Sequence, residues 1–199
     1  MSQQTALSRR SFLGVLPAGL LAGTALAQEA AVGGGSSPSG LRSASVLFVR
    51  HTEKESTPDD PGLTDVGRQR ARGLAAFCRA LPVSHLFATE LRRTQETLAP
   101  LAEQTGLPVV EYGARHPGAL VRQLEVLDGG QCVVVAGHSN TLPKLVELLG
   151  GPSLTGLDTW GFVPEVEYDR VILQALMATG DDAPLRAIQT LDLRLGLVD

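Results

Sequence analysis

The sequence predicts an α/β fold: a three-layer sandwich in which a mostly parallel central sheet is flanked by helices. Short runs rich in β-branched residues alternate with longer segments whose apolar residues recur at helical spacing, as in successive βα units. The run 132–136 is the most apolar of them, as expected for a strand at the centre of such a sheet. With 43% hydrophobic residues among 199, the chain can bury the core of one domain.

Local signals support each expected element. A helix should begin at Thr64, a good N-cap residue, and end before Pro82. Gly106 should close the next helix, and Pro143 is tolerated because it falls in the first turn of the last one. The expected strands are 46–49, 83–88, 107–112, 132–136, 168–176 and 185–193, the last two forming a closing pair, and the expected helices are 64–81, 89–105, 119–127 and 141–149.

The N-terminus has the organisation of an export signal. Arg9 and Arg10 precede an apolar stretch that ends in Ala25-Leu26-Ala27, a small-residue cleavage pattern. Adjacent arginines followed by Phe-Leu resemble a signal of the bacterial twin-arginine pathway. The twin-arginine export machinery would then be a partner, and the mature protein would be periplasmic or secreted, without a membrane anchor. The expected organisation is a signal peptide at 1–27, a flexible Gly- and Ser-rich linker at 28–43 and a folded domain at 44–199.

The composition argues against nucleic-acid binding. Only 4% of the residues are aromatic and the net charge is −4, so neither a base-stacking surface nor a basic footprint is present. The two cysteines, Cys78 and Cys132, do not form a disulfide framework. We expect two buried thiols, although a disulfide remains open if the compartment is oxidising.

Two predicted strands end in a histidine. Arg50 and His51 follow the first strand, and His138 follows the central one. The carboxyl ends of parallel strands share one edge of a sheet, so the two imidazoles can converge there. The helix that follows strand 83–88 places Arg93 at the same edge of the sheet. Arginines around two histidines predict a pocket for a phosphate dianion.

Other kinds of site are less well supported. Two histidines are too few ligands for a metal, and adjacent arginines repel a cation. No cofactor motif is found, and Gly137-His138-Ser139 lacks the nucleophile elbow of a Ser-His-Asp hydrolase. A histidine nucleophile fits better, because one ring nitrogen can attack phosphorus while the other donates to a fixed acceptor.

Four motifs follow one another along the chain: Arg50-His51-Thr52-Glu53, Leu63-Thr64-x-x-Gly67-x-Gln69-x-Ala71, Thr89-x-Leu91-x-Arg93-Thr94-x-x-Thr97 and Gly137-His138-Ser139-Asn140-Thr141. In this order they resemble the motifs of the histidine phosphatase superfamily, which has the phosphoglycerate-mutase-like fold. The resemblance spans about residues 44–178 and implies that His51 is phosphorylated and that Arg50, Arg93 and His138 hold the phosphoryl group. Thr52 stands where the family has Gly, so the loop should be less open.

The proton donor to the leaving group is less well defined. The family usually supplies a carboxylate from between the arginine helix and the second histidine, where Glu111 is the acid available and His116 a rival. The compact branch that resembles the bacterial phosphohistidine phosphatases can lack such an acid. Its absence would restrict the substrates to those with good leaving groups.

These observations predict an exported, metal-independent phosphatase without a cofactor. It would hydrolyse phosphate monoesters or phosphoramidates of a small molecule or a phosphoprotein through a phosphohistidine intermediate. The alternatives are a non-catalytic periplasmic module that binds phosphorylated ligands and, with less support, a phosphomutase, because the chain lacks the long insertions of such enzymes.

Overall fold

The computed structural model describes residues 40–180 and 182–196. The expected signal peptide and residues 28–39 of the expected linker lie outside these residues. The first strand begins at Leu41 rather than at the predicted domain start, residue 44. It begins earlier because Leu41 and Ser43 pair with Thr179 and Met177 of a later strand.

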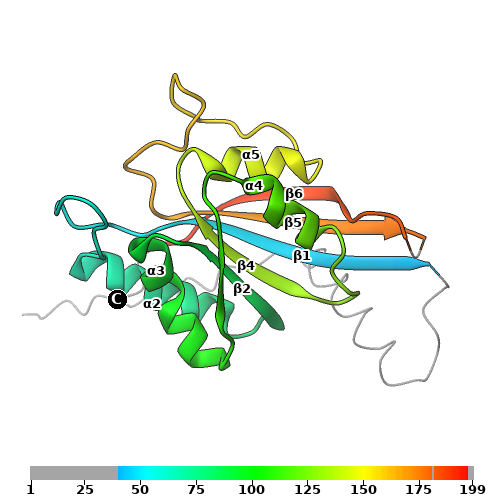
Figure 1. Cartoon of the computed structure of the whole chain (residues 1–199), viewed down its shortest axis with the longest axis horizontal. Coiled ribbons are helices and arrows are strands. Elements are labelled where there is room, and N and C mark those ends of the chain that lie inside the picture. The colour runs from blue at the N-terminus through cyan, green and yellow to red at the C-terminus, as the bar shows by residue number, and fades with distance from the viewer. Residues whose placement is uncertain (1–39, 181, 197–199) are drawn as a thin grey trace, which may run out of the picture. The chain divides into compact units, whose positions relative to one another are not determined.

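Six strands form one sheet in the order β3-β2-β4-β1-β5-β6 (Figure 1). The first four in this order are parallel to one another, and β5 and β6 add to the β1 side as antiparallel strands. The mostly parallel sheet and the closing pair of strands are therefore confirmed. The strands are β1 (Leu41–Arg50), β2 (Val83–Thr89), β3 (Val109–Tyr112), β4 (Cys132–Gly137), β5 (Arg170–Thr179) and β6 (Arg186–Arg194).

Helices cover both faces of the sheet, as predicted for a three-layer sandwich (Figure 1). On one face, α2 (Asp65–Cys78) and α3 (Arg92–Thr105) contribute Leu74 and Leu98 to a core that includes Leu47 of β1. On the other face, α4 (Pro117–Leu124) and α5 (Thr141–Leu148) pack against the alternate side chains of β1 and β4. The strand β4 is buried along its whole length and lies between β2 and β1, which confirms its central position.

Helices α2 and α3 use the predicted capping residues Thr64 and Gly106, but several bounds differ from the prediction. Helix α2 ends at Cys78 rather than at residue 81, and α4 spans Pro117–Leu124 rather than 119–127. Thr64 caps α2 by accepting a hydrogen bond from the Gly67 amide, and Gly106 closes α3 in the left-handed conformation with φ 72°. Helix α3 begins at Arg92 rather than at the predicted residue 89 or 90, because Leu91 is still extended. The carboxylate of Asp60, from a distant loop, accepts from the Arg92 amide and caps this helix.

The two cysteines belong to the same core but are not joined. Cys78 on α2 and Cys132 at the start of β4 are both buried and free. Burial raises the pKa of the Cys78 thiol to about 12, so that it stays protonated at neutral pH. The structure therefore agrees with two buried thiols and not with the disulfide alternative.

Candidate functional site

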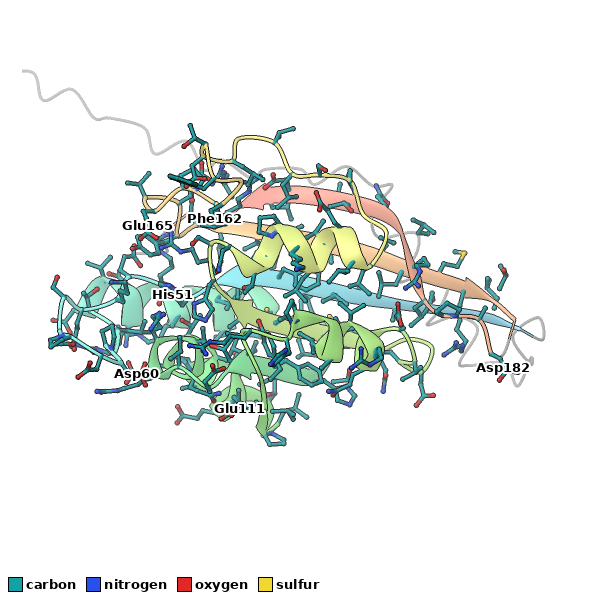
Figure 2. The ribbon with its side chains drawn as sticks, turned by 45° about the horizontal axis from the view of Figure 1, so that its top comes forward. His51, Asp60, Glu111, Phe162, Glu165 and Asp182 are labelled. Carbon is teal, nitrogen blue, oxygen red and sulfur yellow. The ribbon has the colours of Figure 1, made fainter. Side chains whose placement is uncertain are left out.

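The pairing of β1 with β4 brings the two histidines together. Arg50 pairs with Gly137, so the two strands end at the same level. The amide of His51 donates to the Gly137 carbonyl over 2.9 Å, which extends the pairing by one residue. The imidazole rings of His51 and His138 lie 5.5 Å apart between their centroids, and both residues are buried. Figure 2 shows His51 at this end of the sheet.

A hydrogen bond fixes the proton of the His51 ring. Nδ1 lies 2.8 Å from the carbonyl oxygen of Thr52, and since a carbonyl only accepts, Nδ1 must carry the hydrogen. The Nε2 lone pair is then available for attack on an electrophile. Burial lowers the pKa of His51 to about 3, and the nearby arginine charges act in the same direction, against the Thr52 hydrogen bond. At neutral pH the ring is therefore an uncharged potential nucleophile.

A chain of hydroxyl groups orients His138. Its Nε2 lies 3.0 Å from Oγ1 of Thr89 at the end of β2, and this hydroxyl lies 2.8 Å from that of Thr94 on α3. The His138 amide donates to Oγ1 of Thr141. Burial lowers the pKa of His138 to about 4, assisted by the charge of Arg93 and opposed by that of Glu90.

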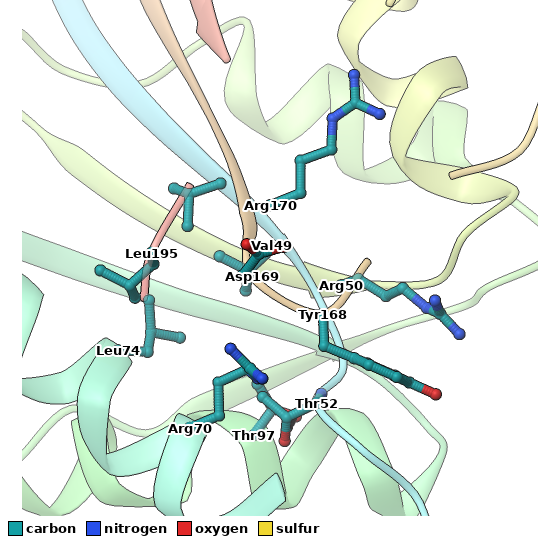
Figure 3. Close-up of a pocket in the computed structure, with 11 residues that line it drawn as sticks. Val49, Arg50, Thr52, Arg70, Leu74, Thr97, Tyr168, Asp169, Arg170 and Leu195 are labelled. Carbon is teal, nitrogen blue, oxygen red and sulfur yellow. Dashed lines mark hydrogen bonds between the residues drawn. The ribbon is translucent and has the colours of Figure 1, made fainter. Parts of the chain in front are cut away.

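Arg50 is held rigidly at the end of β1. Its side chain is 1% exposed, and its Nη1 donates to the carbonyls of Pro164 and Glu165. Nη2 donates to the Glu165 carboxylate over 2.9 Å. The guanidinium lies 4.5 Å from the centroid of the Tyr168 ring, in a cation–π contact. Figure 3 shows the two side chains running in the same direction.

Both predicted site arginines retain an unused donor. Arg93 lies on the first turn of α3, and its closest carboxylate partner is Asp60, at 3.8 Å. Within the part of the chain that the structure describes, the Nε–H groups of Arg50 and Arg93 are buried without a hydrogen-bond partner. Buried donors are normally paired, so unpaired ones beside two histidines indicate an anion site.

Thr52 joins the site loop to both helices on one face of the sheet. Its hydroxyl donates to the Gly67 carbonyl of α2, and its amide donates to Oγ1 of Thr97 on α3. Thr52 itself is buried. The carbonyl that orients His51 is thus fixed through Gly67 and Thr97, two residues of the sequence motifs.

A small pocket lies beside Arg50 and Thr52 and extends between β1, β5 and α2 (Figure 3). Neither histidine lines it. Among its lining residues are Tyr168, Leu74 and Leu195. It adjoins Arg50 but includes neither imidazole.

The structure does not bring Glu111 to the histidines, so its assignment as proton donor is corrected. Glu111 is exposed on β3, which β2 and β4 separate from β1. Three strand spacings amount to about 14 Å, and Figure 2 shows Glu111 well apart from His51. The neighbouring Tyr112 takes the inward position and donates to the Ala136 carbonyl. The rival, His116, is an exposed residue at the N-terminus of α4.

Two carboxylates that were not predicted lie at the site. Glu165, from the loop before β5, contacts Arg50, and Glu90 directly follows Thr89 and acts on the charge state of His138. Glu90 already accepts a hydrogen bond from the Ala114 amide. The position of Glu90 beside the Thr-x-Leu-x-Arg motif could have indicated its proximity, whereas no sequence signal identifies Glu165.

The described ranges, 40–180 and 182–196, hold no group of three or more His, Cys, Asp or Glu side chains arranged to bind a metal ion. No helix in the same ranges is long and apolar enough to cross a membrane.

Residues 46–114 match the sequence model of the histidine phosphatase superfamily (branch 1). A relative named probable phosphoglycerate mutase GpmB, from Enterobacter sp. (strain 638), is 33% identical over 72 residues. The match spans 33% of this chain and 34% of the relative, so it covers about a third of the relative's length.

Two solved structures share the fold at low sequence identity. The protein histidine phosphatase SixA, in complex with tungstate, has a TM-score of 0.54 and 16% identity, over 74% of this chain and 96% of that one. A structure named mycobacterial hydrolase 2 has a TM-score of 0.55 and 15% identity, over 79% of this chain and 93% of that one.

Proposed function

We propose that the chain is a member of the histidine phosphatase superfamily, whose sequence model matches residues 46–114, and that it is a phosphatase in which His51 is the nucleophile. The substrate would be a phosphate monoester or a phosphoramidate, carried by a small molecule or a protein. The observation that carries the proposal is the His51 ring, which is uncharged at neutral pH and whose Nδ1–H donates to the Thr52 carbonyl, so that the lone pair is on Nε2.

The proposed reaction has two steps. Nε2 of His51 attacks phosphorus, the bond to the leaving group breaks, and a phosphohistidine forms. Water then attacks the same phosphorus, the P–N bond breaks, and inorganic phosphate leaves. Both steps spread negative charge over the equatorial phosphoryl oxygens, which Arg50, Arg93 and His138 would stabilise.

The unused arginine donors support a phosphoryl group in this position. The Nε–H groups of Arg50 and Arg93 are buried without partners in the described structure, and both arginines flank the histidines. A phosphoryl group has three oxygens that can accept such hydrogen bonds. The arginine fork matches this geometry better than a lysine would.

We also propose that the protein is exported by the twin-arginine route and acts without a metal. The export proposal rests on Arg9, Arg10 and the small-residue pattern that ends at Ala27. Metal independence rests on Arg50 and Arg93, whose positive charges act on the two histidines and would repel a metal cation. N-terminal sequencing of the exported protein should begin at Gln28; a protein that keeps Met1 in the cytosol would contradict export.

A substrate screen tests the function. The full-length chain and its His51→Ala variant are assayed with aryl phosphates, sugar phosphates, phosphoramidate and phosphohistidine peptides, with and without chelator. We expect release of inorganic phosphate that resists chelation and is lost in the variant. Transfer to a second hydroxyl would identify a mutase instead, and binding without turnover would identify a non-catalytic module. Activity that the variant retains in full would contradict a His51 nucleophile.

A further inference from the structure

The loop from residue 149 to residue 169, which joins α5 to β5, is attached to the site at two points. The amide of Val163 donates to the carbonyl of Ser139, the residue after His138, over 3.0 Å. Two loop carbonyls accept from Nη1 of Arg50, the residue before His51. The loop is therefore positioned by the same two strand ends that carry the histidines.

Glu165 is the acidic side chain that this loop presents to Arg50. Its Oε2 lies 2.9 Å from Nη2 of Arg50. The Glu165 side chain is 73% exposed and that of Arg50 only 1%, so the carboxylate lies on the solvent side of the guanidinium. Figure 2 shows Glu165 beside Phe162, near the end of the sheet where His51 lies.

The leaving group must also lie on the solvent side. His51 attacks phosphorus from the buried side, and in an in-line displacement the leaving atom is opposite the nucleophile. A phosphoryl group held by Arg50 would therefore place its leaving oxygen toward the mouth of the site. Glu165 already lies on this outer side of Arg50.

The other nearby carboxylates are committed elsewhere. Both Asp60 oxygens accept from the Arg92 amide, where they cap α3. Glu90 accepts from the Ala114 amide and from its own, which lowers its pKa and favours the ionised form. Glu165 has only the Arg50 side chain as a partner in the described structure, and a phosphoryl group can replace it there.

We propose that Glu165 is the proton donor to the leaving group, an inference that rests on the proposed phosphatase function. When substrate binds, the phosphoryl oxygens take the Nη2–H of Arg50. Glu165 then loses its cationic partner and gains a dianionic neighbour, and both changes favour the neutral carboxylic acid. The released side chain lies next to the leaving oxygen.

The proton balance closes over the two steps. As Nε2 of His51 bonds to phosphorus, the P–O bond to the leaving group breaks, its electron pair stays on that oxygen, and Glu165 gives the oxygen its proton. In the second step the Glu165 carboxylate takes a proton from the attacking water. The P–N bond breaks, its electron pair returns to His51, and hydrogen phosphate leaves with Glu165 protonated again.

The test compares Glu165→Gln with the wild type on phenyl phosphate and 4-nitrophenyl phosphate, which differ chiefly in leaving-group basicity. Phenolate needs a proton to leave and 4-nitrophenolate scarcely does. We expect kcat/KM to fall by about 10²-fold for phenyl phosphate and by only a few-fold for 4-nitrophenyl phosphate. Glu103→Gln, an exposed position on α3, is the matched control and should behave as the wild type.

Three results would overturn the inference. An equal loss of kcat/KM on both esters would mean that Glu165 only orients Arg50. No loss on either ester would show that Glu165 takes no part in the reaction. A selective loss on phenyl phosphate in Glu90→Gln, but not in Glu165→Gln, would assign the donor to Glu90. A wild-type protein that hydrolyses neither these esters nor the other substrates of the screen would instead overturn the proposed function itself, and this inference with it.

Discussion

Nδ1 of His51 lies 2.8 Å from the carbonyl oxygen of Thr52, and this contact determines which ring nitrogen can react. The carbonyl is fixed because Thr52 is hydrogen-bonded to both α2 and α3. The helices on one face of the sheet therefore set the orientation of a side chain at its edge. Each of the following predictions concerns a residue that maintains this arrangement or uses it.

Arg93→Ala should lower kcat/KM by about 10²–10³-fold, because a donor to the developing phosphoryl charge is lost. It should also weaken inhibition by inorganic phosphate. Arg93→Lys should not restore the activity, since an ammonium lacks the planar fork. The neighbouring Arg92→Ala is the control, as Arg92 is largely exposed and pairs with Glu96 on the same helix. Similar losses in both variants would refute a specific role for Arg93.

Thr89→Val should lower kcat by about tenfold while changing KM little. The substitution leaves the buried Nε2 of His138 without its hydroxyl partner, which costs about 1–3 kcal/mol and frees the ring to turn. Thr89→Ser keeps the hydroxyl and should restore most of the rate, whereas a purely structural role of the methyl group would leave this variant impaired. The measurement is steady-state kinetics as a function of pH, because the pH dependence of kcat in Thr89→Val should also differ from that of the wild type.

Acid should destabilise the fold through the two site histidines. Burial lowers their pKa to about 3 for His51 and about 4 for His138, below the ordinary 6.5 of the unfolded chain. The unfolded state therefore binds more protons as pH falls below 6.5, and stability falls with pH until the folded values are reached. Between pH 7 and pH 5 each histidine should contribute a loss of about 1–2 kcal/mol.

Urea unfolding at these two pH values, in buffer without phosphate, measures this loss. His138→Gln should show a smaller drop than the wild type, because one of the two titrating groups is gone. Arg115→Gln, an exposed change in the loop before α4, is the control and should keep the wild-type drop. An unchanged pH dependence in His138→Gln would show that the buried ring is not the source.

Gly67→Ala should destabilise the protein although alanine favours helices. A Cβ at this position would clash with the carbonyl oxygen of Glu53, in the backbone of the loop that follows His51. Backbone must move, and such overpacking costs about 1–3 kcal/mol. Gly129→Ala, where a Cβ meets open space, is the matched control. Thermal unfolding and phosphatase activity should both fall in the first variant only.

The sequence was sufficient to predict the layers, the sheet type and the meeting of His51 with His138. These features follow from the strand patterns and from the rule that parallel strands end at one edge of a sheet. They can therefore be predicted without knowing which distant residues are in contact. Local sequence does not predict the start of α3, because the capping carboxylate, that of Asp60, comes from a separate loop. The early start of β1 depends on pairing with the end of β5, which no local pattern specifies.

The carboxylates were the least predictable part of the site. Position along the chain favours Glu111 as the proton donor, but alternation along β3 turns Tyr112 inward and leaves Glu111 exposed on a strand far from β1. Glu165 reaches Arg50 from a loop without regular structure or a recognisable motif. Its approach depends on how that loop folds over two strand ends, which is a tertiary property.

Trapping the phosphorylated enzyme tests the central claim most directly. The full-length protein is mixed with a ³²P-labelled aryl phosphate and quenched within milliseconds in alkali, in which a P–N bond survives. We predict label bound to the protein that is released by acid, maps to the peptide containing His51 and is absent from His51→Ala. Turnover without protein-bound label, or label on any other residue, would contradict a phosphohistidine at His51.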